Sequence, residues 1–196
     1  SLFMALAKSL IKSVALRAEN PDPGAVLTRA SAEIDRDNPE SLFVTVFAGL
    51  LDTRTGSLQF CNAGHEPPRL RGAGASTLSV QHEGGPPLCV VEGYEYPTGH
   101  RLLREGECLC VVTDGVTEAM NRRSELYGAA RLDHVLAAMK GTEPEAVLAE
   151  VSRDVAAFVD GAEPSDDLTL LCVRWEGPGS AALAPAEEED FEISER

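Results

Sequence analysis

The sequence is short of basic residues and has no long apolar run. It carries 17 Lys and Arg against 32 Asp and Glu, which gives a formal net charge of −15 at pH 7. Because an anionic surface repels phosphate backbones and anionic lipid headgroups, nucleic acid is not expected as a partner. The longest apolar run, residues 42–51, is far shorter than the roughly 20 residues that a helix needs to cross a bilayer. We therefore expect no membrane insertion of this segment.

Cysteine is also scarce, and its count is odd. The five cysteines are Cys61, Cys89, Cys108, Cys110 and Cys172. Most of them lie in apolar, strand-like contexts, so we expect reduced thiols and a cytoplasmic protein rather than a disulfide framework. Cys108 and Cys110 would share one face of a strand, and they lack the C-x-x-C turn of a zinc knuckle or redox pair. A zinc ion bound through cysteine is therefore not expected.

The remaining composition is typical of a globular domain. The chain has 196 residues, of which 43% are hydrophobic and 25% charged, and this length is enough for one large core. We predict a single domain over residues 1–176. Small, proline-containing and acidic residues follow, so residues 177–196 are predicted to be an acidic linker or tail, of the kind that leads into further domains of a parent chain.

Hydrophobic periodicity predicts the order of the elements. A helix is expected over residues 3–14, and Asp22 followed by Pro23 is typical of the cap and first turn of a second helix. β-Branched and aromatic residues then predict a hairpin with strands 42–48 and 58–61. Further strands are predicted at 77–80, 94–96, 100–103, 108–113 and 168–175, and helices at 129–139 and 144–159. This order predicts an α+β sandwich with helices that cover packed sheets.

The first candidate for chemistry is an apolar strand that ends in Thr113, Asp114 and Gly115. A carboxylate at the end of a rigid strand suits a hard divalent cation, and a following glycine lets a ligand approach the backbone. Glu118 would lie near Asp114 if a helix starts there. The alternative is an ordinary strand-to-helix turn in which Asp114 is the cap.

The second candidate is the pair Asp166 and Asp167, at the entrance to another apolar strand. Two adjacent carboxylates repel each other unless a cation or a donor compensates them, so the pair fits half of a metal site. The alternative is a simple turn before a strand. If the strands that carry Asp114 and Asp166 are neighbours, their carboxylates converge on one rim.

The third candidate is a turn that contains Asn62, Gly64 and His65, followed by two prolines. His65 invites a catalytic interpretation, but a lone histidine in a turn is more often structural. The sequence offers no serine in a G-x-S-x-G context and no cysteine in a nucleophile-like setting, so a serine or cysteine hydrolase is not expected.

Together the three motifs resemble a known family. Asn62-Ala-Gly-His65, Thr113-Asp-Gly-Val-Thr-Glu-Ala119 and Ser165-Asp-Asp-Leu-Thr169 look, in this order, like the SpoIIE-like branch of the PPM family of metal-dependent protein serine/threonine phosphatases. The resemblance extends over residues 2–175. It implies a β-sandwich flanked by helix pairs, in α-β-β-α layers, with a two-metal centre of manganese or magnesium at one edge.

The resemblance also implies roles for residues. Asp114 and Asp166 match metal-binding aspartates, and Asp167 stands beside them. Gly115 would allow close approach to the ions. The residues expected to shape the site are Glu118, Asn62, Gly64 and His65. The nucleophile would be a metal-activated water, so no catalytic side chain and no covalent phosphoenzyme are expected.

One motif of the family is not found. In the family a further metal-binding aspartate, in a motif of the type D-x-x-G-H/K-G, precedes a helix that resembles residues 2–10, whereas no aspartate precedes Asp22 in this sequence. We therefore expect a fragment of a longer phosphatase that lacks the first strands of the sandwich and a bridging metal ligand. Such a segment would bind both ions weakly and could be inactive alone.

The function that the resemblance implies is hydrolysis of phosphoserine or phosphothreonine on a regulatory protein, commonly an anti-sigma-factor antagonist in bacterial partner switching. The alternative is a non-catalytic module with a phosphatase fold, which binds and regulates a partner without hydrolysis. The absent upstream motif favours the module. The uncompensated carboxylates at strand ends favour a metal site.

Overall fold

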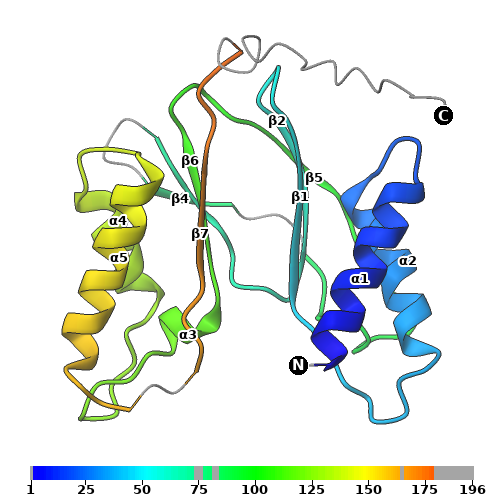
Figure 1. Cartoon of the computed structure of the whole chain (residues 1–196), viewed down its shortest axis with the longest axis horizontal. Coiled ribbons are helices and arrows are strands. Elements are labelled where there is room, and N and C mark those ends of the chain that lie inside the picture. Colours follow the sequence, from blue (N-terminus) through cyan, green and yellow to red (C-terminus); the bar gives the residue numbers. More distant parts are fainter. Residues whose placement is uncertain (1, 73–76, 81–83, 164–165, 179–196) are drawn as a thin grey trace, which may run out of the picture.

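The computed structural model describes residues 2–72, 77–80, 84–163 and 166–178 (Figure 1). The helices are α1 (Leu2–Arg17), α2 (Pro23–Asp35), α3 (Asp114–Thr117), α4 (Ala129–Ala138) and α5 (Pro144–Val159). The strands are β1 (Val46–Asp52), β2 (Ser57–Ala63), β3 (Arg69–Arg71), β4 (Thr77–Ser79), β5 (Gly99–Leu102), β6 (Cys108–Val112) and β7 (Leu170–Arg174). None of the helices in these ranges is long and apolar enough to cross a membrane. The predicted linker or tail lies outside the described residues from 179 onward.

The strands form two antiparallel sheets that face each other, with a pair of helices on each outer side (Figure 1). One sheet has the order β1-β2-β5 and is covered by α1 and α2; the other has the order β4-β3-β6-β7 and is covered by α4 and α5. The buried side chains between the sheets are Leu58, Phe60, Leu70, Leu103 and Leu109. This α-β-β-α layering confirms the predicted α+β sandwich.

The first helix pair forms as the sequence predicts. Asp22 caps α2, because its Oδ1 accepts a hydrogen bond from the backbone N–H of Ala25 at 2.8 Å. The same Oδ1 accepts a second bond from the hydroxyl of Thr98 at 2.8 Å. One side chain therefore starts the helix and also ties it to the segment before β5.

The hairpin of β1 and β2 is confirmed, but β1 begins later than the sequence indicates. Leu42 is held by a side chain instead of by a strand: its N–H donates to Asn38 Oδ1 at 2.9 Å and its carbonyl accepts from Asn38 Nδ2. Val44 makes only an isolated bridge to Leu88. The apolar residues before Val46 therefore belong to a loop, and the ladder starts where Val46 pairs with Ala63.

A strand predicted at residues 94–96 does not form. The N–H of Tyr96 donates to the hydroxyl of Thr28 in α2 at 2.9 Å, and its own hydroxyl donates to the carbonyl of Pro86 at 3.0 Å. Buried and anchored in this way, Tyr96 joins the helix layer to the loop before it. The aromatic residues at 94–96 therefore belong to a packed loop and not to a strand that pairs in a sheet.

β3 is a strand that the sequence analysis misses, because arginines stand where apolar residues are expected. Arg69 and Arg71 are only 5% and 2% exposed. Arg69 Nε donates to Asp133 Oδ1 at 2.9 Å, and Arg71 Nε donates to the carbonyl of Gly141 at 2.8 Å. These bonds to α4 and the residues after it let two charged side chains lie inside the domain.

Candidate metal centre

Asp114 stands where the second sheet ends. β6 stops at Val112, and α3 begins at Asp114, so the carboxylate lies at the junction of a buried strand and a one-turn helix. Asp114 itself is exposed, whereas Gly115 and Val116 behind it are buried. The strand fixes the backbone, and the side chain remains open to a ligand.

The second aspartate motif comes to the same rim, as the neighbouring strands predict. β6 and β7 are antiparallel partners, with Val112 opposite Leu170. Beyond the ladder, Thr113 fastens the two segments: its N–H donates to the carbonyl of Thr169 at 3.1 Å, and its hydroxyl accepts from the N–H of Thr169 at 3.2 Å. The same hydroxyl donates to the carbonyl of Asp167 at 3.3 Å. The backbones that carry Asp114 and Asp167 are therefore held side by side.

Gly115 is required by this close approach. A Cβ at position 115 would lie 2.3 Å from the carbonyl oxygen of Asp167, which is far inside van der Waals contact. Gly115 therefore contributes to the site by having no side chain. The expected role of Gly115 in admitting a ligand stays a prediction; in the structure the missing side chain lets the backbone of the second aspartate motif approach.

The donor set at this rim is open. Asp114, Asp166 and Asp167 are all exposed, and Asp166 Oδ1 accepts a hydrogen bond from the N–H of Asp167 at 2.7 Å. Within the described residues, no group of three or more His, Cys, Asp or Glu side chains is arranged so that it could hold a metal ion. The chemistry of the donors, carboxylates beside water, fits a hard cation such as Mg²⁺, which is commonly bound through one or two protein carboxylates and several waters. The ligand roles of these three aspartates stay predictions.

Glu118 closes the short helix that Asp114 opens. Its N–H donates to the carbonyl of Asp114 at 2.7 Å, so a helical turn does start at the aspartate, as expected. Its side chain is exposed on the same turn. A role for Glu118 in shaping the site stays a prediction.

The turn of the third motif is rigid, and it belongs to the other sheet. Asn62 Oδ1 accepts from the N–H of His65 at 2.8 Å, while Asn62 Nδ2 donates to the carbonyl of His65 at 2.9 Å. Gly64 has φ +69°, and a Cβ there would lie 2.7 Å from Pro87. Burial raises the pKa of the neighbouring Cys61 to about 11, so this thiol is protonated at neutral pH and is no nucleophile.

The two sheets bring their motifs to one end of the sandwich. The indole of Trp175, after β7, donates to the carbonyl of Thr53 in the hairpin turn at 2.8 Å, which fixes the opposite end. The end of β2 and the start of α3 therefore share the other end (Figure 1). In the described part of the chain, however, no hydrogen bond of the Asn62 to His65 turn reaches the three aspartates. Thr113, whose hydrogen bonds join the two aspartate segments, lies inside the first motif but carries no sequence signal for this role.

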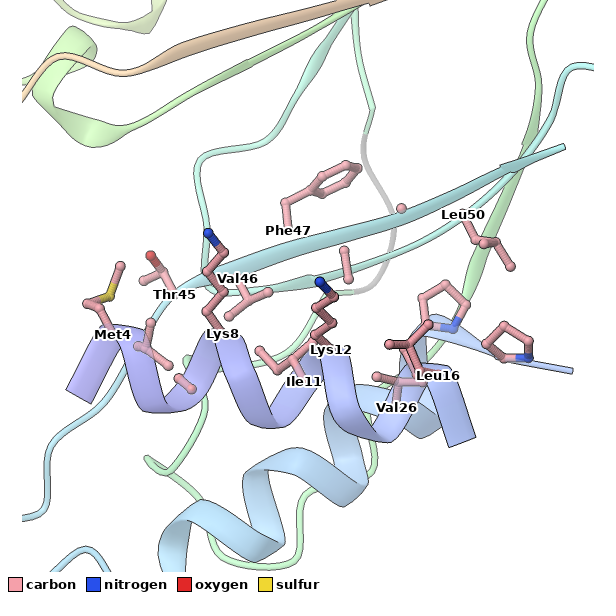
Figure 2. Close-up of a pocket in the computed structure, with 17 residues that line it drawn as sticks. Met4, Lys8, Ile11, Lys12, Leu16, Val26, Thr45, Val46, Phe47 and Leu50 are labelled. Atoms are coloured by element: carbon pink, nitrogen blue, oxygen red, sulfur yellow. The ribbon is translucent and has the colours of Figure 1, made fainter. Parts of the chain in front are cut away.

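Among the hollows of the described structure, one lies beside the first sheet and another lies beside the aspartates. A groove of about 670 Å³ lies between α1 and β1, is mostly apolar, and is crossed by Lys8 and Lys12 (Figure 2). Its lining includes no described carboxylate, so it is separate from the aspartates. A smaller pocket of about 250 Å³ lies between α3 and α5, and its wall includes Gly115 and Asp166.

Comparison with known proteins gives a consistent result. A family model described as Stage II sporulation protein E (SpoIIE) matches residues 1–176. Protein IcfG of Synechocystis sp. is 29% identical over 136 residues, which are 68% of this chain and 21% of IcfG. The chain thus spans about a fifth of the length of this curated relative.

Solved structures share the fold. The RsbU and RsbW domains of Rv1364c from Mycobacterium tuberculosis align with a TM-score of 0.69 and 25% identity, over 90% of this chain and 48% of that one. The phosphatase domain of the cell fate determinant SpoIIE from Bacillus subtilis, presoaked with Mn, aligns with a TM-score of 0.59 and 16% identity, over 87% of this chain and 73% of that one. Since the family model matches most of its length, the chain belongs to the Stage II sporulation protein E (SpoIIE) family, the SpoIIE-like branch of the PPM phosphatases.

Proposed function

We propose that this chain is the catalytic part of a metal-dependent protein serine/threonine phosphatase. The observation that carries the proposal is the rim at which Thr113 clamps Asp114 beside the backbone of Asp167, in a chain of the SpoIIE family. Carboxylates held by rigid strands at an open edge are suited to an ion that must also contact a substrate.

The carboxylates of Asp114, Asp166 and Asp167 would hold Mn²⁺ or Mg²⁺. When bound, these ions would supply an activated water and would neutralise the phosphoryl oxygens. Thr113 would keep the two aspartate segments in register, and Gly115 would let them approach. A phosphorylated side chain needs free access from solvent, and the exposure of all three aspartates provides it.

The substrate that we propose is phosphoserine or phosphothreonine on a small regulatory protein, such as an anti-sigma-factor antagonist in bacterial partner switching. The RsbU and RsbW domains of the aligned Rv1364c structure support this class of partner. The chain has a net charge of −15, so a phosphoprotein is not attracted by the surface as a whole. The metal ions and local basic groups must supply the attraction.

A second candidate is a non-catalytic module that binds and regulates a partner. The open donor set favours it, because no closed group of three ligands is found among the described residues. The two candidates differ in one measurable property: only the phosphatase has turnover that depends on both a divalent ion and Asp114.

The test is phosphate release from an aryl phosphate by the purified chain, with and without millimolar manganese. We expect turnover that needs manganese, shown by the chain itself or after addition of the upstream segment that carries the missing aspartate, and we expect Asp114→Asn to abolish it. The variant should lose little stability, because removal of one clustered carboxylate relieves repulsion. Asp37→Asn, an exposed aspartate after α2, is the matched control and should keep full activity.

Two outcomes would count against the proposal. Turnover that survives in Asp114→Asn would move the chemistry away from this rim. Absence of turnover and of manganese binding by calorimetry, both persisting after the upstream segment is added, would favour the regulatory module.

A further inference from the structure

The pocket between α3 and α5 differs from the surface around it. It is walled mainly by apolar side chains, among them Ala156 and Val159 of α5, in a chain with a net charge of −15. Met120 and Leu168, which also line it, are 41% and 43% exposed. Exposed apolar side chains gathered around a hollow are typical of a binding site rather than of an ordinary surface.

The pocket is continuous with the candidate metal centre. Gly115 and Asp166 form part of its wall, and Gly115 directly follows Asp114. A group that sits in the pocket is therefore within one or two residues of a phosphoryl group at the aspartates. The size fits the same interpretation: about 250 Å³ is below the roughly 300–1,000 Å³ typical of pockets for small-molecule ligands, and it suits one large side chain.

The charges at the pocket restrict its occupant. Its two ionisable wall residues are Glu163 and Asp166, both carboxylates. An acidic occupant would be repelled, whereas a segment that presents an apolar side chain flanked by basic residues complements both the wall and the rim. The described residues of the pocket therefore form an apolar cavity with two carboxylates, Glu163 and Asp166, in its wall.

We propose that this pocket receives one apolar side chain of the phosphoprotein substrate, next to the phosphorylated residue. This inference rests on the proposed function. It concerns how a phosphatase with an acidic surface selects its substrate. Burial of a leucine in such a socket strengthens binding by about tenfold or more. Basic flanking residues add long-range attraction toward Glu163 and Asp166.

The test measures binding, so it does not depend on turnover. A set of fluorescein-labelled phosphoserine peptides carries arginines at its ends and a single leucine at one of the positions from two before to two after the phosphoserine. Each has a partner peptide with serine in place of leucine. Fluorescence anisotropy with millimolar manganese gives the dissociation constants. We expect one leucine position to bind about tenfold more tightly than its serine partner.

Two matched variants locate the effect. Ala156→Glu places a charged side chain in the pocket, and Ala157→Glu places the same side chain on the same helix outside it; both positions are exposed, so both variants should fold. Ala156→Glu should bind the leucine and serine peptides equally, and Ala157→Glu should keep the wild-type preference.

The inference is overturned if no leucine position strengthens binding, if no peptide binds at all, or if Ala156→Glu keeps the preference. Aryl phosphate turnover by the wild-type chain, measured in parallel, reports on the proposed function alone. An inactive chain that still prefers one leucine peptide would count against turnover by this chain alone and leave the pocket assignment standing.

Discussion

At the scale of single residues, Asp154 of α5 binds two side chains, Tyr127 and Arg131. Its Oδ2 accepts from the hydroxyl of Tyr127 at 2.8 Å and from Arg131 Nε at 2.8 Å, and its Oδ1 accepts from the same guanidinium at 3.1 Å. The guanidinium also stacks over the ring of Phe158, 4.8 Å from its centroid. Asp154 therefore fixes α5 to the start of α4.

Asp154→Ala should lower the free energy of unfolding by about 1–3 kcal/mol at pH 7, because the buried hydroxyl of Tyr127 loses its acceptor. The hydrogen bond from Arg131 holds the pKa of Asp154 below its ordinary value of 3.8. Because the pKa of Asp154 is lower in the folded than in the unfolded protein, its ionised carboxylate stabilises the fold fully at pH values above the unfolded pKa. This stabilisation is lost as the pH falls through the folded pKa. The difference between wild type and variant should thus be full above about pH 5 and shrink in more acidic solution.

Urea unfolding of both proteins at neutral and acidic pH measures this difference. Glu150→Ala, which removes an exposed ion pair with Arg153, is the control and should cost less than about 0.5 kcal/mol. A difference for Asp154→Ala that stays constant down to pH 3 would show that the carboxylate acts through packing rather than charge.

At the scale of elements, the cap of α2 joins a local signal to a distant contact. Asp22 caps the helix, and Thr98 both donates to Asp22 and accepts from the N–H of Gly24 at 2.8 Å. Asp22→Ala should therefore destabilise the domain by about 1–2 kcal/mol, and Asp22→Asn should cost much less, because asparagine is an equally good cap. Thermal unfolding of the two variants decides this, and equal losses would mean that the charge of Asp22 matters more than its cap geometry.

The same element shows what a sequence can predict. Asp22 before Pro23 acts within one turn of chain, so the start of α2 is predicted correctly, and the two hairpin strands follow from local alternation. β3 is not predicted because Arg69 and Arg71 are buried with hydrogen-bond partners that lie more than sixty residues away along the chain. At the site, the residue types of Asp114 and Asp167 are visible in the sequence. Their convergence depends on the pairing of β6 with β7 and on the Thr113 clamp, which no local pattern encodes.

At the scale of the whole molecule, the excess of acidic residues opposes folding. A net charge of −15 on 196 residues produces self-repulsion that added salt screens. Raising NaCl from about 0.02 M to about 0.5 M should raise the melting temperature by about 2–4 °C, which corresponds to on the order of 1 kcal/mol. KCl should act equally. A melting temperature that falls with salt would show that the exposed ion pairs outweigh the net repulsion.

The groove beside β1 also affects how copies of the protein meet. In the described sheet β1 is an edge strand that pairs with β2, and an edge strand left unpaired in this chain can template association from molecule to molecule. Lys8 and Lys12 extend from α1 across this strand (Figure 2). Two copies that met edge to edge would crowd four ammonium groups into an apolar cleft. We therefore expect Lys8 and Lys12 to oppose edge-to-edge association of this chain, in which positive charges are few.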